Sequence, residues 1–349
     1  MESYKIINKE EYLKIIEVSE NELKEIIKNK SISYRKYLIP NKKYSKCRSI
    51  YIITNKSDIY RLQRNLQKRF FNNFYFPSNV YGFVKQKSYI DYMVPHCSRN
   101  LSKYYLRLDI NSFFDTITIK QIKECLNFYI DDTCDNKEKK FIVDSIAEIV
   151  TLDDKLIQGA ITSPVISNLV FRRLDIRIER FCEKNNITYT RYADDMLFSG
   201  FDDVVHKGYF INMIASIIKK QGFSLNYNKT LKMYEELSLN GYVIGEEIRL
   251  SRKKYKAVNL ILFYLNRREI NAPISRVFKY NLINKLAGYR SLFIQVLRYV
   301  YDSRNIDTIQ KKISEIEKGI DKLVKFDEGV SGSRRADENK ILIDIYKMK

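Results

Sequence analysis

The chain has 349 residues, of which 45% are hydrophobic, and its 62 Lys and Arg against 42 Asp and Glu give a formal net charge of +20. This composition excludes a disordered chain and suits one multi-lobed fold or two domains. The positive field favours a polyanion, and nucleic acid is the default partner. No apolar run reaches the ~18 residues of a membrane span, so no membrane partner is expected.

The cysteines exclude two common uses of this residue. Five are present, an odd number, and they are scattered without a Cys-x-x-Cys pair. This pattern argues against a disulfide framework and against a zinc site. The N-terminus is polar and charged, unlike a signal peptide. We therefore expect reduced thiols and a cytoplasmic location.

The first hundred residues alternate between helical and extended patterns. We expect one or two helices over 9–29, two strands joined by a basic turn over 34–55, and an amphipathic helix over 57–70. The basic turn is interpreted either as a phosphate grip or as an exposed hairpin without a ligand. A helical stretch follows that carries His96, which we interpret as a core residue and not as a ligand.

The next segment places a single acid at the end of an apolar strand. The strand runs over 104–109 and ends at Asp109, a position that is typical of a functional site. Helices are expected over 119–129 and 137–149. The loop that follows contains Gly159, which either allows close approach to a ligand or simply precedes a helix that begins at Pro164.

Two adjacent acids lie at the tip of an expected hairpin over 186–200. Asp194 and Asp195 separate two short runs of β-branched and aromatic residues. Burying two such acids without a counter-charge is unfavourable, so a cation is expected, although a solvated turn is the simpler alternative. Beyond them we expect a helix over 206–220 and a strand over 223–230 that ends near Lys229.

From residue 239 the chain is first extended and then helical. A short hairpin is expected over 239–245, followed by basic helices from residue 251. The last residues read as a charged amphipathic helix over 306–326, a linker and a short tail.

Three carboxylates suffice for a particular chemistry. Asp109, Asp194 and Asp195 have the hard oxygen ligands that hold two divalent cations about 4 Å apart in phosphoryl transfer. We predict two Mg²⁺ ions, with Mn²⁺ as an alternative. Two acids alone would hold only one such ion well, so Asp109 is essential to this interpretation.

The motifs that surround these acids occur in the order found in reverse transcriptases, and the bacterial retron-type branch is the most similar. They are Asp109 with Phe113-Phe114, Gln158-Gly159-Ala160 with Thr162-Ser163-Pro164, Ser167-Asn168-Leu169, Tyr192-Ala193-Asp194-Asp195, Gly222-Phe223 to Lys229, and Leu239-Asn240-Gly241. Upstream, Tyr34 to Ile50, Gln63 and Gly82-Phe83 resemble the fingers of that branch. Six motifs in order are far more specific than one.

The resemblance implies an α+β fold shaped as a right hand, with fingers, a palm sheet of antiparallel strands packed on helices, and a helical thumb. It implies an N-terminal helical extension over 1–30, fingers and palm over 31–245, a thumb over 246–328, and a linker and tail over 329–349.

The resemblance also implies residue roles. Asp109, Asp194, Asp195 and the Ile110 carbonyl would bind metal, and Lys229 would be the general acid for pyrophosphate. Phe114, beside Phe113, would be the steric gate against a ribose 2′-OH. The remaining implied contacts are Arg48, Lys42, Gln158 and Gly159 to the incoming deoxynucleotide, and Tyr192, Ala193, Gly241, Arg252, Lys253 and Lys254 to primer and template.

Two departures from the retron pattern keep a second branch open. Retron enzymes usually carry Asn-Ala-x-x-His, whereas residues 92–96 keep only the His, and Leu239-Asn240-Gly241 stands where Val-Thr-Gly is usual. A defence-associated reverse transcriptase with its own noncoding RNA is therefore the close alternative.

Three functions are weighed. The first is an RNA-directed DNA polymerase that copies a cognate structured noncoding RNA into DNA in bacterial anti-phage defence. The second is untemplated or protein-primed DNA synthesis, with one of the 27 Tyr as primer. The third is a non-catalytic RNA-binding scaffold, against which the three acids argue. The RNA, the priming group, a toxin or effector partner and the oligomeric state stay open.

Overall fold

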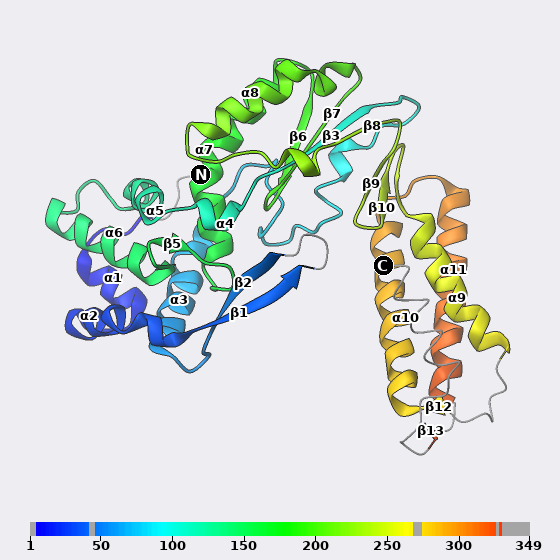
Figure 1. Ribbon diagram of the computed structural model, residues 1–349, viewed down its shortest axis with the longest axis horizontal. Helices are drawn as coiled ribbons and strands as arrows, with labels where there is room; N and C mark the ends of the chain where they lie inside the picture. Colours follow the sequence, from blue (N-terminus) through cyan, green and yellow to red (C-terminus); the bar gives the residue numbers. More distant parts are fainter. Residues whose placement is uncertain (1–4, 42–45, 268–273, 326–327, 330–349) are drawn as a thin grey trace. The chain divides into compact units, whose positions relative to one another are not determined.

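A computed structural model describes residues 5–41, 46–267, 274–325 and 328–329, with backbone only for 40, 41, 46–49, 274, 328 and 329. The chain divides into two compact units (Figure 1). The first unit comprises residues 1–92, 106–198 and 203–232, and the second comprises 93–105, 199–202 and 233–349. No helix of the described part combines the length and the apolar character needed to cross a membrane.

Part of the first unit is a helical layer whose helices begin at polar caps. The side chains of Asn8, Ser19, Ser57, Thr118 and Asp135 each accept a hydrogen bond from the first turn that follows, which satisfies an otherwise unpaired N–H. The helices are α1 (Lys9–Ile16), α2 (Glu20–Lys28), α3 (Asp58–Arg69), α5 (Ile119–Leu126) and α6 (Asn136–Val150). These agree with the helices expected from the periodicity.

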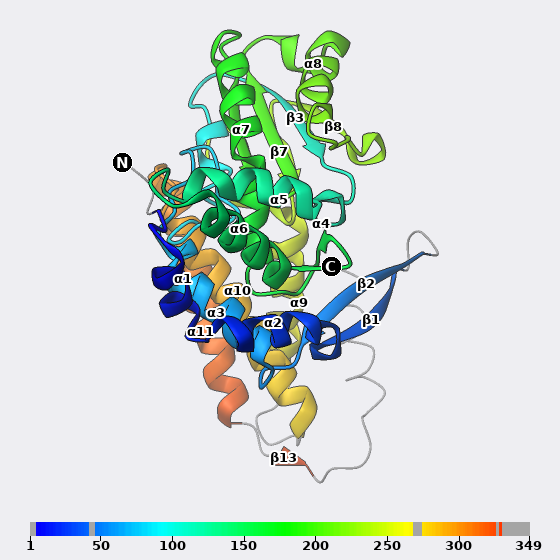
Figure 2. The same ribbon diagram turned by 90° about the vertical axis from the view of Figure 1, so that its left-hand side faces the viewer.

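A two-stranded ribbon extends from this layer (Figures 1 and 2). Strands β1 (Tyr34–Asn41) and β2 (Lys46–Ile53) pair antiparallel from Tyr34 opposite Ile53 to Asn41 opposite Lys46. The base of the ribbon is fixed by Gln63, whose buried amide donates to the Tyr34 hydroxyl at 3.0 Å and to the Ile149 carbonyl at 2.9 Å. The expected hairpin is confirmed, and its basic turn, residues 42–45, lies outside the described residues.

The central sheet has the strand order β6-β7-β3-β8. Its strands are β3 (Tyr104–Asp109), β6 (Thr188–Tyr192), β7 (Asp195–Gly200) and β8 (Leu231–Tyr234). Helix α7 (Ser163–Glu183) contacts β6, and helix α8 (Gly208–Lys219) packs on the sheet through Phe210, whose ring lies edge-on 5.4 Å from Phe198. Within the sheet, Phe198 stacks 5.0 Å from Tyr189. The short elements α4 (Phe113–Thr116), β4 (Thr151–Leu152) and β5 (Lys155–Leu156) complete the unit.

Two expected elements are wrong. The strand over 223–230 is replaced by a bridge of Leu225 to Ile110 and a 3₁₀ turn over Tyr227–Lys229, and β8 begins only at Leu231. The chain turns because the Asn226 N–H is taken by the Asp109 carbonyl at 2.8 Å. The helical stretch at His96 is one 3₁₀ turn, Val94–His96, which contains Pro95 and is followed by extended Cys97.

The second unit contains a small antiparallel sheet and three long helices. Strands β9 (Leu237–Leu239), β10 (Tyr242–Ile244) and β11 (Ile248–Leu250) are followed by α9 (Arg252–Arg267), α10 (Arg276–Leu297) and α11 (Ser303–Lys325), with a short β12 (Ile274–Ser275) and β13 (Glu328–Gly329). Gly319 allows α11 to approach α9 closely, because a Cβ there would lie 2.8 Å from Leu262. The predicted tail beyond Gly329 lies outside the described residues.

His96 is a core residue, as the sequence suggested. Its side chain is fully buried, and its Nδ1 lies 2.7 Å from the Ser199 hydroxyl. Burial lowers the pKa of His96 from its ordinary value of 6.5 to about 3, with a smaller contribution from Lys103. The folded chain therefore holds this imidazole neutral at every pH above about 3.

This depressed pKa predicts acid sensitivity. Below pH 6.5 the unfolded chain takes up a proton that folded His96 refuses, so stability present above pH 6.5 is lost as the pH falls toward 3. Lowering the pH from 6.5 to 5 should remove ~2 kcal/mol of unfolding free energy through this group. Urea titrations at the two pH values should show a smaller difference in unfolding free energy for His96→Gln than for the wild type. Equal pH dependence of the two proteins would contradict the prediction.

Candidate active site

The three acids come together where β3 meets the β6–β7 hairpin. Asp109 is the last residue of β3, and Asp194 and Asp195 lie at the hairpin tip, as expected from the sequence. The backbone N–H of Ile110 donates to the Asp194 carbonyl at 2.9 Å, which ties the strand end to the hairpin. Two residues 84 positions apart in the chain thus meet at one backbone hydrogen bond.

The Ile110 carbonyl faces the same side as this hydrogen bond. The pair Ile110–Leu225 is bracketed by bonds of its neighbours, Asn111 N–H to the Ser224 carbonyl and Asn226 N–H to the Asp109 carbonyl. In such an antiparallel pair the residue's own N–H and C=O point away from its partner. The Ile110 carbonyl therefore points toward the hairpin, where it was expected to serve as a ligand.

Asp109 is held by a lysine. Its carboxylate is 2% exposed, and the Lys229 ammonium lies 2.9 and 2.8 Å from its two oxygens. Lys229 is 43% exposed, so its charge stays in contact with solvent while it neutralises the buried acid. The 3₁₀ turn over 227–229 gives Lys229 this position.

Asp195 is held by an arginine that the sequence reading missed. The Arg107 Nε lies 3.0 Å from Asp195 Oδ1, and an Arg107 terminal nitrogen lies 2.5 Å from the same atom. Burial raises the pKa of Asp195 above its ordinary value; Arg107 opposes the rise, and Asp194 and Asp109 add to it. The signal was in the sequence: Arg107 and Asp109 are two residues apart on one strand and share a face.

The donor set fits a hard divalent cation. Within the described residues, no three His, Cys, Asp or Glu side chains are already grouped around a common point as metal ligands. Lys229 and Arg107 instead balance two of the three acids. Burial raises the pKa of Asp195, and the nearby Asp194 and Asp109 add to the rise; a bound cation would oppose both effects.

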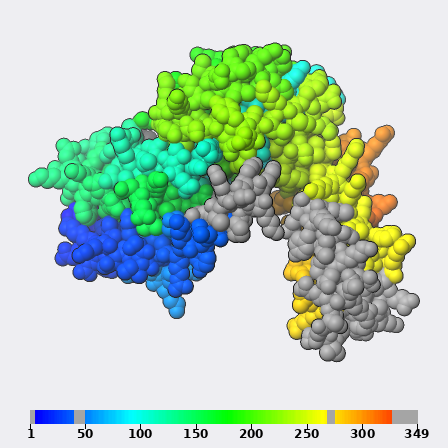
Figure 3. Space-filling view, in the orientation of Figure 1, coloured from blue at the N-terminus to red at the C-terminus, as the bar shows by residue number. Residues whose placement is uncertain are grey.

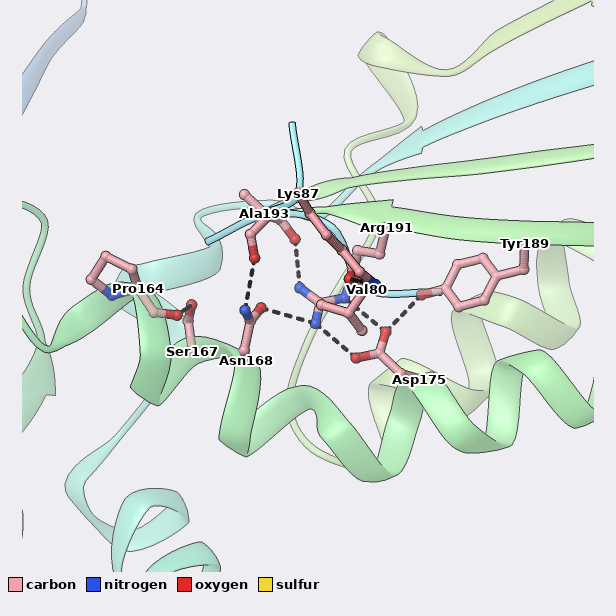
Figure 4. A network of polar contacts seen from close by, with 10 residues as sticks. Val80, Lys87, Pro164, Ser167, Asn168, Asp175, Tyr189, Arg191 and Ala193 are labelled. Atoms are coloured by element: carbon pink, nitrogen blue, oxygen red, sulfur yellow. Dashed lines mark hydrogen bonds and ion pairs between the residues drawn. The ribbon is translucent and has the colours of Figure 1, made fainter. Parts of the chain in front are cut away.

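A buried ion pair supports the hairpin from below (Figure 4). The Arg191 guanidinium and the Asp175 carboxylate are fully buried and joined by two bonds of 2.7 Å. Tyr189 donates to Asp175 at 2.9 Å, and Arg191 donates to the Asn168 side-chain oxygen at 3.1 Å. Such bidentate geometry satisfies the charges that burial would otherwise penalise.

The same arginine holds the turn. Arg191 donates to the Ala193 carbonyl at 2.9 Å, and Ala193 has a φ of +56°, a left-handed backbone that costs a non-glycine residue about 1 kcal/mol. Gly82 packs against the turn. Its carbonyl accepts a hydrogen bond from the Asn168 side chain at 2.8 Å, and a Cβ at this position would lie 2.3 Å from the Ala193 nitrogen. The turn that carries the acids is therefore fixed from two directions.

An aromatic row borders the acids. Phe114 is half-buried, and its ring lies 6.1 Å from Phe83, which lies 6.5 Å from Tyr192. Phe113 is only 3% exposed and packs 5.6 Å from Phe171 and 5.7 Å from Phe223. Phe113 thus belongs to the core and supports Phe114, so of the two only Phe114 is placed to meet a substrate.

The loop at Gln158 and Gly159 contacts the ribbon. The Tyr51 N–H donates to the Gln158 carbonyl at 3.1 Å, and a Cβ on Gly159, whose φ is +107°, would lie 2.0 Å from the Tyr51 carbonyl. The close approach that this glycine allows is therefore to the backbone of β2. Whether a nucleotide also meets this loop stays a prediction.

The other predicted contacts lie elsewhere. Lys42 and the Arg48 side chain are outside the described residues. Gly241, with a φ of +89°, forms the β9–β10 turn of the second unit, against the methylenes of Lys254. Arg252 and Lys253 lie in the first turn of α9. The four described cysteines, Cys97, Cys125, Cys134 and Cys182, are free thiols.

Comparison with known proteins identifies the family. The family described as "Reverse transcriptase (RNA-dependent DNA polymerase)" matches residues 39–260. Retron Ec86 reverse transcriptase of Escherichia coli is 28% identical over 244 residues, 68% of this chain and 67% of that protein. Retron Mx65 reverse transcriptase of Myxococcus xanthus is 28% identical over 203 residues, 54% of this chain and 47% of that protein.

The fold is similar to that of a solved polymerase. Apo telomerase of Candida tropicalis superposes with a TM-score of 0.51 at 12% identity, covering 90% of this chain and 61% of that one. The mixed α+β fold with antiparallel sheets is thereby confirmed. The chain spans about half the length of the Mx65 enzyme and about three fifths of the telomerase chain. On the match to residues 39–260, and on its similarity to the retron enzymes, the chain belongs to the reverse transcriptase family and is of the retron type.

Proposed function

We propose that this chain is an RNA-directed DNA polymerase that extends a primer by nucleotidyl transfer at Asp109, Asp194 and Asp195. The observation that carries the proposal is the hydrogen bond between Ile110 and Asp194, which joins the end of β3 to the acidic hairpin. Membership of the reverse transcriptase family indicates nucleotidyl transfer. The three converging carboxylates are the oxygen ligands that two-metal catalysis of this reaction needs.

The metal site would consist of the three carboxylates and the Ile110 carbonyl. Bound Mg²⁺ would supply Lewis-acid stabilisation of the attacking and leaving oxygens. The chain's part is to hold the ligands in place through Arg191 and Gly82, and to release Lys229 from Asp109. Lys229 is then near enough to the acids to donate a proton to the departing pyrophosphate.

Phe114 is the proposed selector of deoxynucleotides. Its ring is fixed by Phe113 at 5.5 Å and by Phe83 at 6.1 Å, so it has little freedom to yield to a 2′-hydroxyl. Phe114→Ala should lower the preference for dNTP over rNTP, measured as a ratio of kcat/KM, by roughly 10- to 100-fold. Phe114→Tyr keeps the ring and should keep the preference. If Phe114→Ala left the ratio of kcat/KM for dNTP over rNTP unchanged, Phe114 would not be the steric gate.

Replacing Lys229 should have two opposite effects. Lys229→Gln removes a proton donor and should lower kcat by about 10²-fold. It also removes the cation that competes for Asp109, so half-maximal activity should need less Mg²⁺. Titrating Mg²⁺ in a primer-extension assay separates the two effects. Lys219→Gln, an exposed change on α8, serves as the control, and a Lys229→Gln enzyme with wild-type kcat would contradict the acid role.

The finer proposal concerns the template. From the similarity to enzymes named as retron reverse transcriptases, we propose that the template is a cognate structured noncoding RNA and that the role is anti-phage defence. Sequencing the DNA that copurifies with the protein tests this. A DNA copy of one RNA segment is expected, whereas a homopolymer or a random tract would favour untemplated or protein-primed synthesis. Absence of DNA together with bound RNA would favour a scaffold.

A further inference from the structure

The largest unexplained feature of the first unit is a cavity of about 1230 Å³ between α5, α7 and the turns at 128–131 and 220–222. Typical ligand pockets reach ~1000 Å³, so the space is large enough for an extended ligand. In Figure 3 the blue-green residues around 120–140 form part of the visible surface. Nothing in the proposed polymerase reaction uses this cavity.

The cavity and the catalytic hairpin lie on different faces of α7. Asn168 and Asp175, seven residues apart, face the hairpin through their bonds to Arg191. Leu169, Arg173 and Ile176 line the cavity. At 3.6 residues per turn these three positions point roughly 110° away around the helix from Asn168 and Asp175, so the cavity is a separate site.

The lining is strongly positive. It contains five cationic side chains, Lys5, Lys120, Arg172, Arg173 and Lys220, and two acidic ones, Glu124 and Asp131. Among the described carboxylates, none forms an ion pair with Lys120, Arg173 or Lys220. These charges are therefore available to an anion, and their spread around one groove suits a chain of phosphates better than a single ion.

An exposed aromatic ring lies on the same groove. Phe128 is 55% exposed, and the Arg173 guanidinium carbon lies 4.0 Å from its ring centroid. Arg172 donates to the Tyr129 hydroxyl at 2.9 Å, which fixes the neighbouring cation. A stacked Arg and an exposed ring form a flat surface on which an unpaired base stacks, and duplexes do not offer such bases.

We propose that this groove binds single-stranded nucleic acid, with phosphates on Lys120, Lys220 and Arg172 and an unpaired base on the Phe128–Arg173 surface. The site is additional to the polymerase site and would hold a single-stranded stretch while synthesis proceeds elsewhere. RNA and DNA share this chemistry, so the test uses both.

The absence of tryptophan from the chain gives a direct test, because Phe128→Trp introduces a single indole that can be excited at a longer wavelength than the 27 tyrosines. Base stacking on the indole should quench its emission when a 12-nucleotide oligouridylate or oligothymidylate is added. Tyr209→Trp places the fluorophore at an exposed position on α8, 56% exposed in the wild type, and should show no quenching. Quenching by one oligonucleotide only would identify the nucleic acid. No quenching of Phe128→Trp, or equal quenching of both variants, would overturn the proposal.

A charge test uses the salt dependence of binding. Lys120→Gln with Lys220→Gln should reduce the slope of log K against log salt by about 1.4, since each phosphate contact on a single strand contributes ~0.7. Lys137→Gln with Lys140→Gln makes the same charge change on the exposed face of α6 and should leave the slope unchanged. Equal slopes for both double variants would overturn the phosphate contacts.

Polymerase activity is measured separately. Primer extension on oligo(dT) annealed to poly(rA) should stay within twofold of wild type in Phe128→Ala and in the Lys120/Lys220 variant, since neither touches the acids. A loss of extension in these variants would place the groove in the polymerase site and overturn its separate role. If the wild type showed no primer extension while the emission of the Phe128→Trp variant was quenched by the oligonucleotide, the proposed function alone would be refuted.

Discussion

Asp194→Asn should abolish DNA synthesis while leaving the fold intact. The change keeps the size of the side chain and the backbone carbonyl that accepts from Ile110, but it removes one negative charge from the metal ligands. Metal ions supply several kcal/mol of transition-state stabilisation, so we expect kcat to fall by at least ~10³-fold, about 4 kcal/mol. Primer extension under single-turnover conditions measures it.

The same variant should separate metal binding from folding. Burial, with a smaller contribution from Asp194 and Asp109, raises the pKa of Asp195, and bound Mg²⁺ would stabilise the ionised carboxylates against both effects. Mg²⁺ should therefore raise the Tm of the wild type, since a ligand that binds only the folded state stabilises it. Asp194→Asn should lose this shift. Asp153→Asn, the same change at an exposed residue whose φ of +50° an asparagine tolerates, should retain both the shift and the activity.

Nucleic-acid binding should survive loss of the acids. Asp194→Ala combined with Asp195→Ala should bind RNA as the wild type does, because binding depends on dispersed Lys and Arg. Gel-shift and primer-extension assays on one preparation compare the two properties. Unchanged DNA synthesis in this double variant would refute the polymerase assignment, whereas loss of RNA binding would show that the acids also maintain the binding surface.

The sequence predicted where the acids lie, at a strand end and at a hairpin tip, because that signal is local. Asp109 ends an apolar strand, and Asp194 and Asp195 interrupt two apolar runs, so spacing along the chain was enough. The strand over 223–230 was mistaken because its apolar residues make only one bridge, and the turn at Asn226 depends on a carbonyl from β3. A tertiary hydrogen bond of this kind leaves no periodic pattern in the sequence.

The supports of the site were harder to foresee. Arg191 reads as a surface charge until Asp175 is placed beside it, and these residues are joined only when α7 packs on β6. Asn168 and Asp175 are spaced by two helical turns, and this spacing of two polar residues on one face was the sequence feature that could have indicated a buried polar partner. Gly159 was expected to allow close approach to a ligand; the close approach that the structure shows is to the Tyr51 backbone, which comes from a distant segment.

Because Arg191 supports the hairpin, we expect its replacement to cause a large loss of unfolding free energy. Arg191→Met leaves the Asp175 carboxylate fully buried without its cation, and breaking a buried pair in this way costs about 3–5 kcal/mol of unfolding free energy. Urea denaturation should show this loss. Neutralising the partner as well, in Arg191→Met with Asp175→Asn, removes the stranded charge, so much of the stability should return.

Activity should not return with stability. The double variant still lacks the bond from Arg191 to the Ala193 carbonyl, which holds the strained turn between Tyr192 and Asp194. A small misplacement of the reacting groups costs ~10²-fold in rate, so we expect kcat to stay about 10- to 100-fold low while the KM for dNTP changes little. A purely structural role for Arg191 predicts the opposite, a double variant that recovers stability and kcat together. The split between unfolding free energy and kcat therefore distinguishes a positioning residue from a packing one.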